Sequence, residues 1–140
     1  MKDYRISVVR EPEKEEIKPI IEGIARYGLE AIGGEQPKSL AVLFKADSGE
    51  VTGGATGQAI LGHFHLSHLW VTPSQRGRGY GSHILEAITA EADKLGCCEI
   101  RLDTMNPRSF PFYERHGYSP YARIPDYLPG FERVFYVKRI

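Results

Sequence analysis

The sequence is poor in cysteine. Its only two cysteines, Cys97 and Cys98, are adjacent in the chain, and neighbouring cysteines rarely form a disulfide without strain. Two thiolates are also too few to complete a zinc site. These absences argue against a disulfide scaffold and a structural metal, and they favour a reduced, cytoplasmic protein that binds no metal.

Long apolar runs and an excess of one charge are also missing. No stretch approaches the roughly 18 apolar residues of a membrane-spanning helix, and residues 1–5 lack the apolar core of a signal peptide. The chain carries 18 basic and 18 acidic side chains. This balance argues against a nucleic acid or an anionic membrane as a constitutive partner.

The sequence does contain enough apolar material for one core. Of its 140 residues, 41% are hydrophobic and 11% are aromatic, and a chain of this length typically buries roughly two-thirds of its unfolded surface. The chain has no internal repeat and no recognisable linker. We therefore predict a single mixed α/β domain over residues 1–140.

Local patterns indicate the elements of this domain. Apolar residues at helical spacing predict helices over residues 12–27, 82–95 and 107–116, the first of them kinked or split at Pro19. Alternating or continuous apolar runs predict strands, and these cover residues 4–9, 39–46, 51–61, 62–72, 98–103, 118–124 and 131–139. We expect residues 28–37 to be irregular and residues 125–130 to form a loop.

The most informative stretch is the turn between the fourth of these strands and the helix over residues 82–95. It reads Arg76-Gly77-Arg78-Gly79-Tyr80-Gly81. Backbone amides at a helix start have no intrahelical partner, and the helix dipole adds a positive end, so this turn is suited to bind an anion. The glycines allow close approach of a bulky anion, and the arginines supply charge-assisted donors for phosphate oxygens.

Two common nucleotide-binding motifs fit this turn poorly. A Walker loop has lysine and then serine or threonine after its second glycine, whereas Tyr80-Gly81-Ser82 stands here. A dinucleotide turn reads G-x-G-x-x-G and opens the first parallel βαβ unit, whereas this turn has a different spacing and lies past the middle of the chain. Both nucleotide classes are therefore disfavoured.

The turn resembles the R/Q-x-x-G-x-G/A signature of the GNAT superfamily of acetyl-CoA-dependent N-acetyltransferases. Two more segments are similar to that family: Leu69-Trp70-Val71, at its fourth strand, and Asn106 with residues 111–118, which match N-x-x-a-x-x-F-Y-x-x-x-G-F apart from Pro111 and Tyr118. The resemblance covers essentially the whole chain. It implies a mixed, mostly antiparallel sheet that is splayed around the cofactor, with helices on both faces.

The resemblance also implies how acetyl-CoA is bound. The loop amides would hold its pyrophosphate, and the main chain of Leu69 and Val71 would pair with the pantetheine amides like an added strand. Asn106 is equally well explained as a turn former. The residues expected to contact the cofactor are Leu69, Trp70, Val71, Arg76, Gly77, Arg78, Gly79, Tyr80, Gly81, Ser82, Asn106 and Tyr113.

Acetyl transfer to an amine also needs a general acid and a general base. Tyr113 resembles the tyrosine that protonates the CoA sulfur in this family, although a core aromatic or a pantetheine contact is the alternative. Counting back from Arg76, His65 falls where some protein-acetylating members carry a catalytic glutamate, and imidazole is suited to accept a proton near neutral pH. His63 could extend a water chain from it, unless both are simply exposed strand histidines.

Strand alternation also bears on the third histidine of this strand. It puts His63, His65 and Ser67 on one face and sends His68 and Trp70 to the other. Only two convergent imidazoles would then remain for a metal, which argues against a metal site here.

The acceptor is less well defined by the sequence. By family likeness its site lies between the first helical region and the loop that joins the last two strands, where Glu30, Asp126 and Tyr127, with His63, would attract and orient a cationic amine. We expect the acetyl group of acetyl-CoA to move to a primary amine of a small molecule by direct attack in a ternary complex. A peptide or protein lysine acetyltransferase and a non-catalytic acyl-CoA-binding module are the alternatives. A homodimer through the last strands is compatible with the resemblance.

Overall fold

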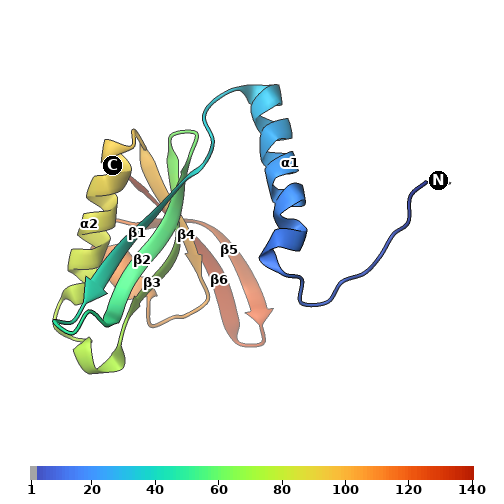
Figure 1. The fold of residues 1–140 in the computed structure, drawn as a ribbon. Coiled ribbons are helices and arrows are strands. Elements are labelled where there is room, and N and C mark those ends of the chain that lie inside the picture. Colours follow the sequence, from blue (N-terminus) through green and yellow to red (C-terminus); the bar gives the residue numbers. More distant parts are fainter. Residues whose placement is uncertain (1–2) are drawn as a thin grey trace. The chain divides into compact units, whose positions relative to one another are not determined.

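The computed structural model describes residues 3–140, and these divide into two compact units at residues 36 and 37. The first unit contains one helix, α1 (Lys14–Ile32), and the second contains a six-stranded sheet with two α-helices (Figure 1). Within the described residues no helix is both long and apolar enough to cross a membrane. The prediction that the chain is one domain is not tested by this division and stays a prediction.

Helix α1 is longer and more continuous than its sequence predicts. It begins after Glu13, whose amide donates to Glu16 Oε2 at 2.8 Å, and it ends at Gly33, whose amide donates to the Leu29 carbonyl at 2.7 Å. Pro19 lies inside it without dividing it. The predicted split at Pro19 is therefore wrong, because one missing amide early in a helix removes a single hydrogen bond. The irregular segment begins at residue 33, not at residue 28, and continues to residue 37.

The predicted strand over residues 4–9 is also wrong. These residues form no strand, and Tyr4, Ile6 and Val8 are each more than 80% exposed. Alternation of polar and apolar residues says which face a strand would bury, but a strand exists only where a neighbouring backbone accepts its hydrogen bonds.

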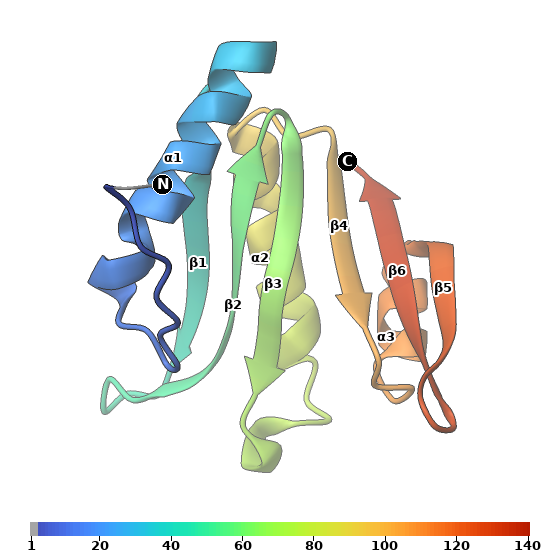
Figure 2. The same ribbon diagram turned by 90° about the vertical axis from the view of Figure 1, so that its right-hand side faces the viewer.

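The sheet of the second unit has the order β1-β2-β3-β4-β6-β5 (Figure 2). Its strands are β1 (Lys38–Lys45), β2 (Val51–Ile60), β3 (His63–Val71), β4 (Glu99–Thr104), β5 (Ser119–Leu128) and β6 (Phe131–Arg139). Every neighbouring pair is antiparallel except β3 and β4, which run parallel. The expected mixed, mostly antiparallel sheet is confirmed.

Helices α2 (Tyr80–Lys94) and α3 (Phe110–Arg115) lie on the same side of this sheet (Figure 2). Four residues at helical spacing bury the inner face of α2: Ile84, Leu85, Ile88 and Ala92. They pack with fully buried strand side chains, the largest of which are Phe64, Ile100, Val134 and Tyr136. The core of the second unit thus lies between α2, α3 and one face of the sheet.

The sheet opens between its two parallel strands. The pairing of β3 with β4 covers only His63–Glu99, Phe64–Ile100 and His65–Arg101, although β3 continues to Val71 and β4 to Thr104. Beyond the third pair the two strands diverge (Figure 2). This is the splay that the resemblance implies, and it exposes main-chain groups along the second half of β3.

A β-bulge in β3 changes which side chains share a face. Thr56 pairs with His68 and Gly57 pairs with Leu66, so Ser67 has no partner on β2. One extra residue shifts the alternation, and His68 and Trp70 therefore turn to the same face as His63 and His65. The prediction that Trp70 and His68 point the opposite way was wrong: Trp70 is 49% exposed, whereas Phe64 is fully buried.

The predicted loop over residues 125–130 was wrong as well. Strand β5 continues to Leu128 and reaches β6 through a turn at residues 129 and 130. Its register shifts between Ile124 and Leu128, where Asp126 has a φ of 48°. This irregularity accommodates Pro125, which cannot donate to a regular ladder.

Candidate active site

A cavity of about 470 Å³ lies where β3 and β4 have diverged, bordered by the end of β3, the turn after it and the starts of α2 and α3. It brings together residues that are far apart in the sequence. Eleven of the residues expected to bind the cofactor line it: Leu69, Trp70, Val71, Arg76, Gly77, Gly79, Tyr80, Gly81, Ser82, Asn106 and Tyr113. Arg78 does not line it.

Five further residues line the cavity that sequence reasoning missed: Gln75, Arg108, Ser109, Phe112 and Arg115. Two of them, Arg108 and Arg115, add positive charge on the side of α3. Both stand within a few residues of Asn106 and Tyr113, so the basic residues inside the second motif were the available signal.

The turn before α2 leaves its backbone amides available. Gly77 and Gly79 have φ values of 74° and 83°, and a Cβ built on either would meet no atom within 4 Å. The first hydrogen bond of the helix runs from the His83 amide to the Gly79 carbonyl, at 3.2 Å. Among residues 3–140 the amides of residues 77–82 have no partner, which is the arrangement that suits a helix start to bind an anion.

Arg76 connects this turn to the end of β3. Its Nε donates to the Val71 carbonyl at 2.8 Å. The guanidinium keeps its other donors, so Arg76 both positions the turn and adds charge to the cavity. The Val71 carbonyl oxygen keeps a second lone pair, so this bond leaves both the carbonyl and the amide of Val71 able to bond a ligand.

Hydrogen bonding along β3 alternates between the two edges of the strand. The Thr72 amide donates to the Thr52 carbonyl at 2.7 Å. In an antiparallel ladder, pairs that are hydrogen-bonded to each other alternate with pairs whose N–H and C=O groups point away from the partner strand. Val71 opposite Gly53 and Leu69 opposite Ala55 belong to the second kind, so their main-chain groups point away from β2. They face the side on which β4 has diverged.

Tyr113 sits at the inner end of α3 with its ring packed among other aromatic rings. Its ring centroid lies 5.2 Å from Phe112, 5.5 Å from Tyr118 and 6.1 Å from Tyr136. The residue is 8% exposed, and burial raises the pKa of its phenol. Its hydroxyl forms no hydrogen bond to any described residue, so a protonated donor borders the cavity.

Asn106 shapes the loop before α3. Its Oδ1 accepts a hydrogen bond from the Arg108 amide at 3.1 Å, and its carbonyl accepts one from Ser109 Oγ at 2.7 Å. The predicted turn role is therefore present. The side-chain NH2 of Asn106 has no hydrogen-bond partner among the described residues. Because Asn106 lines the cavity, this donor is available to a ligand.

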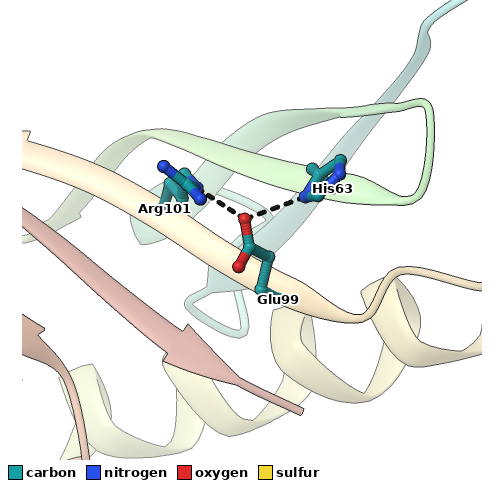
Figure 3. Close-up of polar contacts among 3 residues, drawn as sticks. All are labelled: His63, Glu99 and Arg101. Atoms are coloured by element: carbon teal, nitrogen blue, oxygen red, sulfur yellow. Dashed lines mark hydrogen bonds and ion pairs between the residues drawn. The ribbon is translucent and has the colours of Figure 1, made fainter.

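The histidines of β3 lie on the sheet face opposite α2 and do not line the cavity. His65 is exposed and forms the last pair with β4, opposite Arg101. His63 Nδ1 lies 2.8 Å from Glu99 Oε1 (Figure 3), and His68 Nδ1 lies 2.8 Å from Thr56 Oγ1. Because all three share a face, the alternation argument against a metal no longer holds, although no group of three or more metal-binding side chains occurs within residues 3–140.

Sequence reasoning missed Glu99 because it stands 36 positions after His63. The side chains expected to hold the acceptor are not gathered at the cavity either. Asp126 and Tyr127 lie on β5, and the Tyr127 hydroxyl accepts a hydrogen bond from Arg133 Nη1 at 3.3 Å. Glu30 belongs to α1 of the first unit.

Comparison with known proteins agrees with this geometry. The chain belongs to the Acetyltransferase (GNAT) family, whose model matches residues 5–118. It is 32% identical to Acetyltransferase Atu2258 of Agrobacterium fabrum over 137 residues, which cover 98% of each chain. It is 35% identical to Blasticidin-S acetyltransferase of Streptomyces morookaense over 95 residues, 67% of this chain and 70% of that one. A crystal structure from Agrobacterium tumefaciens, 27% identical, matches with a TM-score of 0.88 over 98% of this chain and all of its own. The protein is therefore an acyltransferase of the GNAT type.

Proposed function

We propose that this acetyltransferase moves the acetyl group of acetyl-CoA to a primary amine of a small molecule, which attacks directly in a ternary complex. One observation carries the proposal. Residues 77 and 79–82, whose amides have no partner among the described residues, line the same cavity as Tyr113, whose hydroxyl is also unpartnered. A turn suited to bind an anion and a proton donor therefore line one cavity beside the end of β3.

The residues present fit acetyl-CoA. The amides at the start of α2, together with Arg76, Arg108 and Arg115, would hold the negative charge of a pyrophosphate. The outward main chain of Leu69, and the Val71 carbonyl through its second lone pair, would pair with the two amides of the pantetheine arm, as an added strand does. When bound, acetyl-CoA supplies an activated acetyl thioester.

The chain's own residues would then assist three events. The free Val71 amide would donate to the acetyl oxygen as negative charge develops on it. Tyr113 would give its proton to the departing sulfur, since burial keeps the phenol protonated. His65 is still our candidate for the general base. It forms the last pair between β3 and β4, opposite Arg101, before the two strands diverge.

A small-molecule acceptor is favoured by one relative. The Streptomyces morookaense protein acetylates blasticidin S, according to its name, and its match covers 67% of this chain. We take the same class of acceptor, an amine on a small molecule, for this protein. A lysine side chain in a protein or peptide is the second candidate.

The test is steady-state CoA release with acetyl-CoA and a panel that contains small-molecule amines and lysine peptides. Tyr113→Phe should lower kcat by about 10²–10⁴-fold, the usual contribution of a general acid, while acetyl-CoA affinity measured by calorimetry stays unchanged. Tyr4→Phe removes a hydroxyl from a residue that is 81% exposed and far from the cavity in sequence, and it is the matched control. Tight acetyl-CoA binding without CoA release for any amine would instead identify a non-catalytic acyl-CoA-binding module.

A further inference from the structure

The turn before α2 carries few side chains that could hold it in place. Its middle reads Gly77-Arg78-Gly79. A Cβ built on either glycine would meet no atom within 4 Å, and Arg78 is exposed. Glycine also has more backbone freedom than any other residue. The direction of the amides in this turn therefore depends on what holds its two ends.

Each end of the turn is anchored by one side chain. At the first end, Arg76 Nε donates to the Val71 carbonyl at 2.8 Å. At the second end stands Tyr80, the first residue of α2, whose ring centroid lies 4.5 Å from that of Phe44 with the planes inclined by 35°. Aromatic pairs at this spacing contribute more than the apolar area that they bury. Phe44 belongs to β1, far from the turn in the sequence.

The sheet gives Phe44 room beside it. Strands β1, β2 and β3 lie next to one another (Figure 2), where Phe44 pairs with Gly53 and Gly53 pairs with Val71. Directly opposite residues share a face of the sheet. A Cβ on Gly53 would lie 2.8 Å from the Trp70 carbonyl oxygen and 3.2 Å from Val71 Cα. A side chain is therefore excluded at position 53, and the face beside Phe44 stays free of one.

The end of β1 is also tied to the residue that leads into the turn. Thr52 Oγ1 donates to the Phe44 carbonyl at 3.3 Å, and the Thr72 amide donates to the Thr52 carbonyl at 2.7 Å. Phe44 is half-buried, and it packs with Tyr80 against the core of the second unit. The chain thus leaves β3 beside Thr72 and returns to the same sheet corner at Tyr80.

Tyr80 links this support to the binding groups. It lines the cavity, and its own amide is one of those without a partner among residues 3–140. The amides at a helix start point along the helix axis, so the placement of Tyr80 governs where they point. Donors that are already oriented need no ordering when a ligand binds, which strengthens binding.

We propose that Phe44 is a positioning residue for the diphosphate of acetyl-CoA: its contact with the Tyr80 ring holds the amides of residues 79–82 in the direction that the diphosphate requires. The inference rests on the proposed function. Phe44 does not line the cavity, so it acts through Tyr80. It serves the diphosphate and has no part in the transfer of the acetyl group.

The first test is calorimetric titration with acetyl-CoA. Phe44→Leu keeps an apolar side chain but loses the ring, and it should weaken binding by about 3–10-fold, within the range that the loss of one aromatic pair can impose. Phe44→Tyr keeps the ring and should bind as the wild type does. The double variant with Tyr80→Leu should bind no more weakly than Tyr80→Leu alone, because both changes remove the same contact.

A matched control is the same substitution in another aromatic pair. Phe135 of β6 is half-buried, its ring centroid lies 6.2 Å from that of Tyr121, and it does not line the cavity. Phe135→Leu should therefore leave the affinity for acetyl-CoA unchanged. An equal loss of affinity in Phe44→Leu and Phe135→Leu would overturn the inference.

The second test separates positioning from a general loss of structure. ADP carries a diphosphate but no pantetheine, and S-acetylpantetheine carries the thioester arm but no diphosphate. In calorimetric competition against acetyl-CoA, Phe44→Leu should weaken ADP by about 3–10-fold and leave S-acetylpantetheine unchanged. In steady-state kinetics KM for acetyl-CoA should rise by the same factor while kcat stays constant. Similar losses for both fragments, or a wild type with which ADP does not compete, would overturn the inference.

The two proposals fail in different ways. If the wild type binds acetyl-CoA but releases CoA with no amine, the proposed function is wrong, and the competition with ADP still decides the role of Phe44. If turnover is normal and Phe44→Leu binds ADP as tightly as the wild type, only the inference is wrong. If Phe44→Leu does not fold, Phe44→Met takes its place in both tests.

Discussion

The two ends of helix α2 offer a matched pair of substitutions that separates binding from folding. Gly79 precedes the helix with φ 83° and Gly96 follows it with φ 81°, and a Cβ on either would meet nothing within 4 Å. Only Gly79 lines the cavity. Gly79→Ala and Gly96→Ala should therefore impose the same backbone strain but differ in their effect on the ligand.

The strain can be estimated from the conformation. A residue with a Cβ in the left-handed region costs roughly 1–2 kcal/mol, and for a chain of this size that lowers Tm by about 3–10 °C. At position 79 the methyl group would also project into the space where the phosphates approach the amides. Loss of one charge-assisted hydrogen bond costs about 1.5–3 kcal/mol, which corresponds to a roughly 10–100-fold weaker Kd for acetyl-CoA.

The assay is thermal unfolding of both variants without ligand, followed by calorimetric titration with acetyl-CoA. We expect similar losses of Tm in the two variants and a loss of affinity in Gly79→Ala alone. Equal affinities in the two variants would refute the assignment of the turn as the phosphate cradle. Unequal losses of Tm would refute the strain estimate.

Three further predictions follow from single side chains. Ile88→Ala, at a fully buried position of α2, should lower the free energy of unfolding by about 2–5 kcal/mol in denaturant titrations, and a loss below about 1 kcal/mol would contradict the core described above. Arg108→Ala should weaken acetyl-CoA binding in calorimetry by roughly 3–30-fold, whereas Arg123→Ala, which removes the same charge from an exposed pair with Glu132, should not; equal effects would argue against a cationic wall at the cavity. The lowered pKa of Glu99 means that its ionised form stabilises the fold above its ordinary pKa of 4.5, and this stabilisation is lost as the pH falls through its lower folded-state value. The Tm difference between wild type and Glu99→Gln should therefore be largest near neutral pH and shrink in acid, and a difference independent of pH would remove the role assigned to the carboxylate.

The turn at residues 76–81 was predictable from the sequence because its chemistry is local. Glycine is the residue that adopts a left-handed φ without strain, and a helix start always leaves amides without partners. The inner face of α2 was predictable for a similar reason, since helical periodicity assigns Ile84, Leu85 and Ile88 to one side whatever packs against them.

Errors in the prediction concern backbone pairing. Nothing in the composition of residues 4–9 says whether a sheet edge is available to them, and nothing in Pro125 or Asp126 says that β6 will support an irregular strand there. Strand alternation failed at Ser67 because the bulge depends on how β3 is aligned with β2.

The sequence by itself determined where backbone amides would be left without partners and which face of α2 would be buried, because each depends on neighbours within a few residues. Only the tertiary structure decided that β3 and β4 part after His65, that Trp70 and His68 turn outward and that Glu99 meets His63. Those arrangements depend on the register between strands distant in the sequence, and a shift of one residue in that register moves every following side chain to the opposite face.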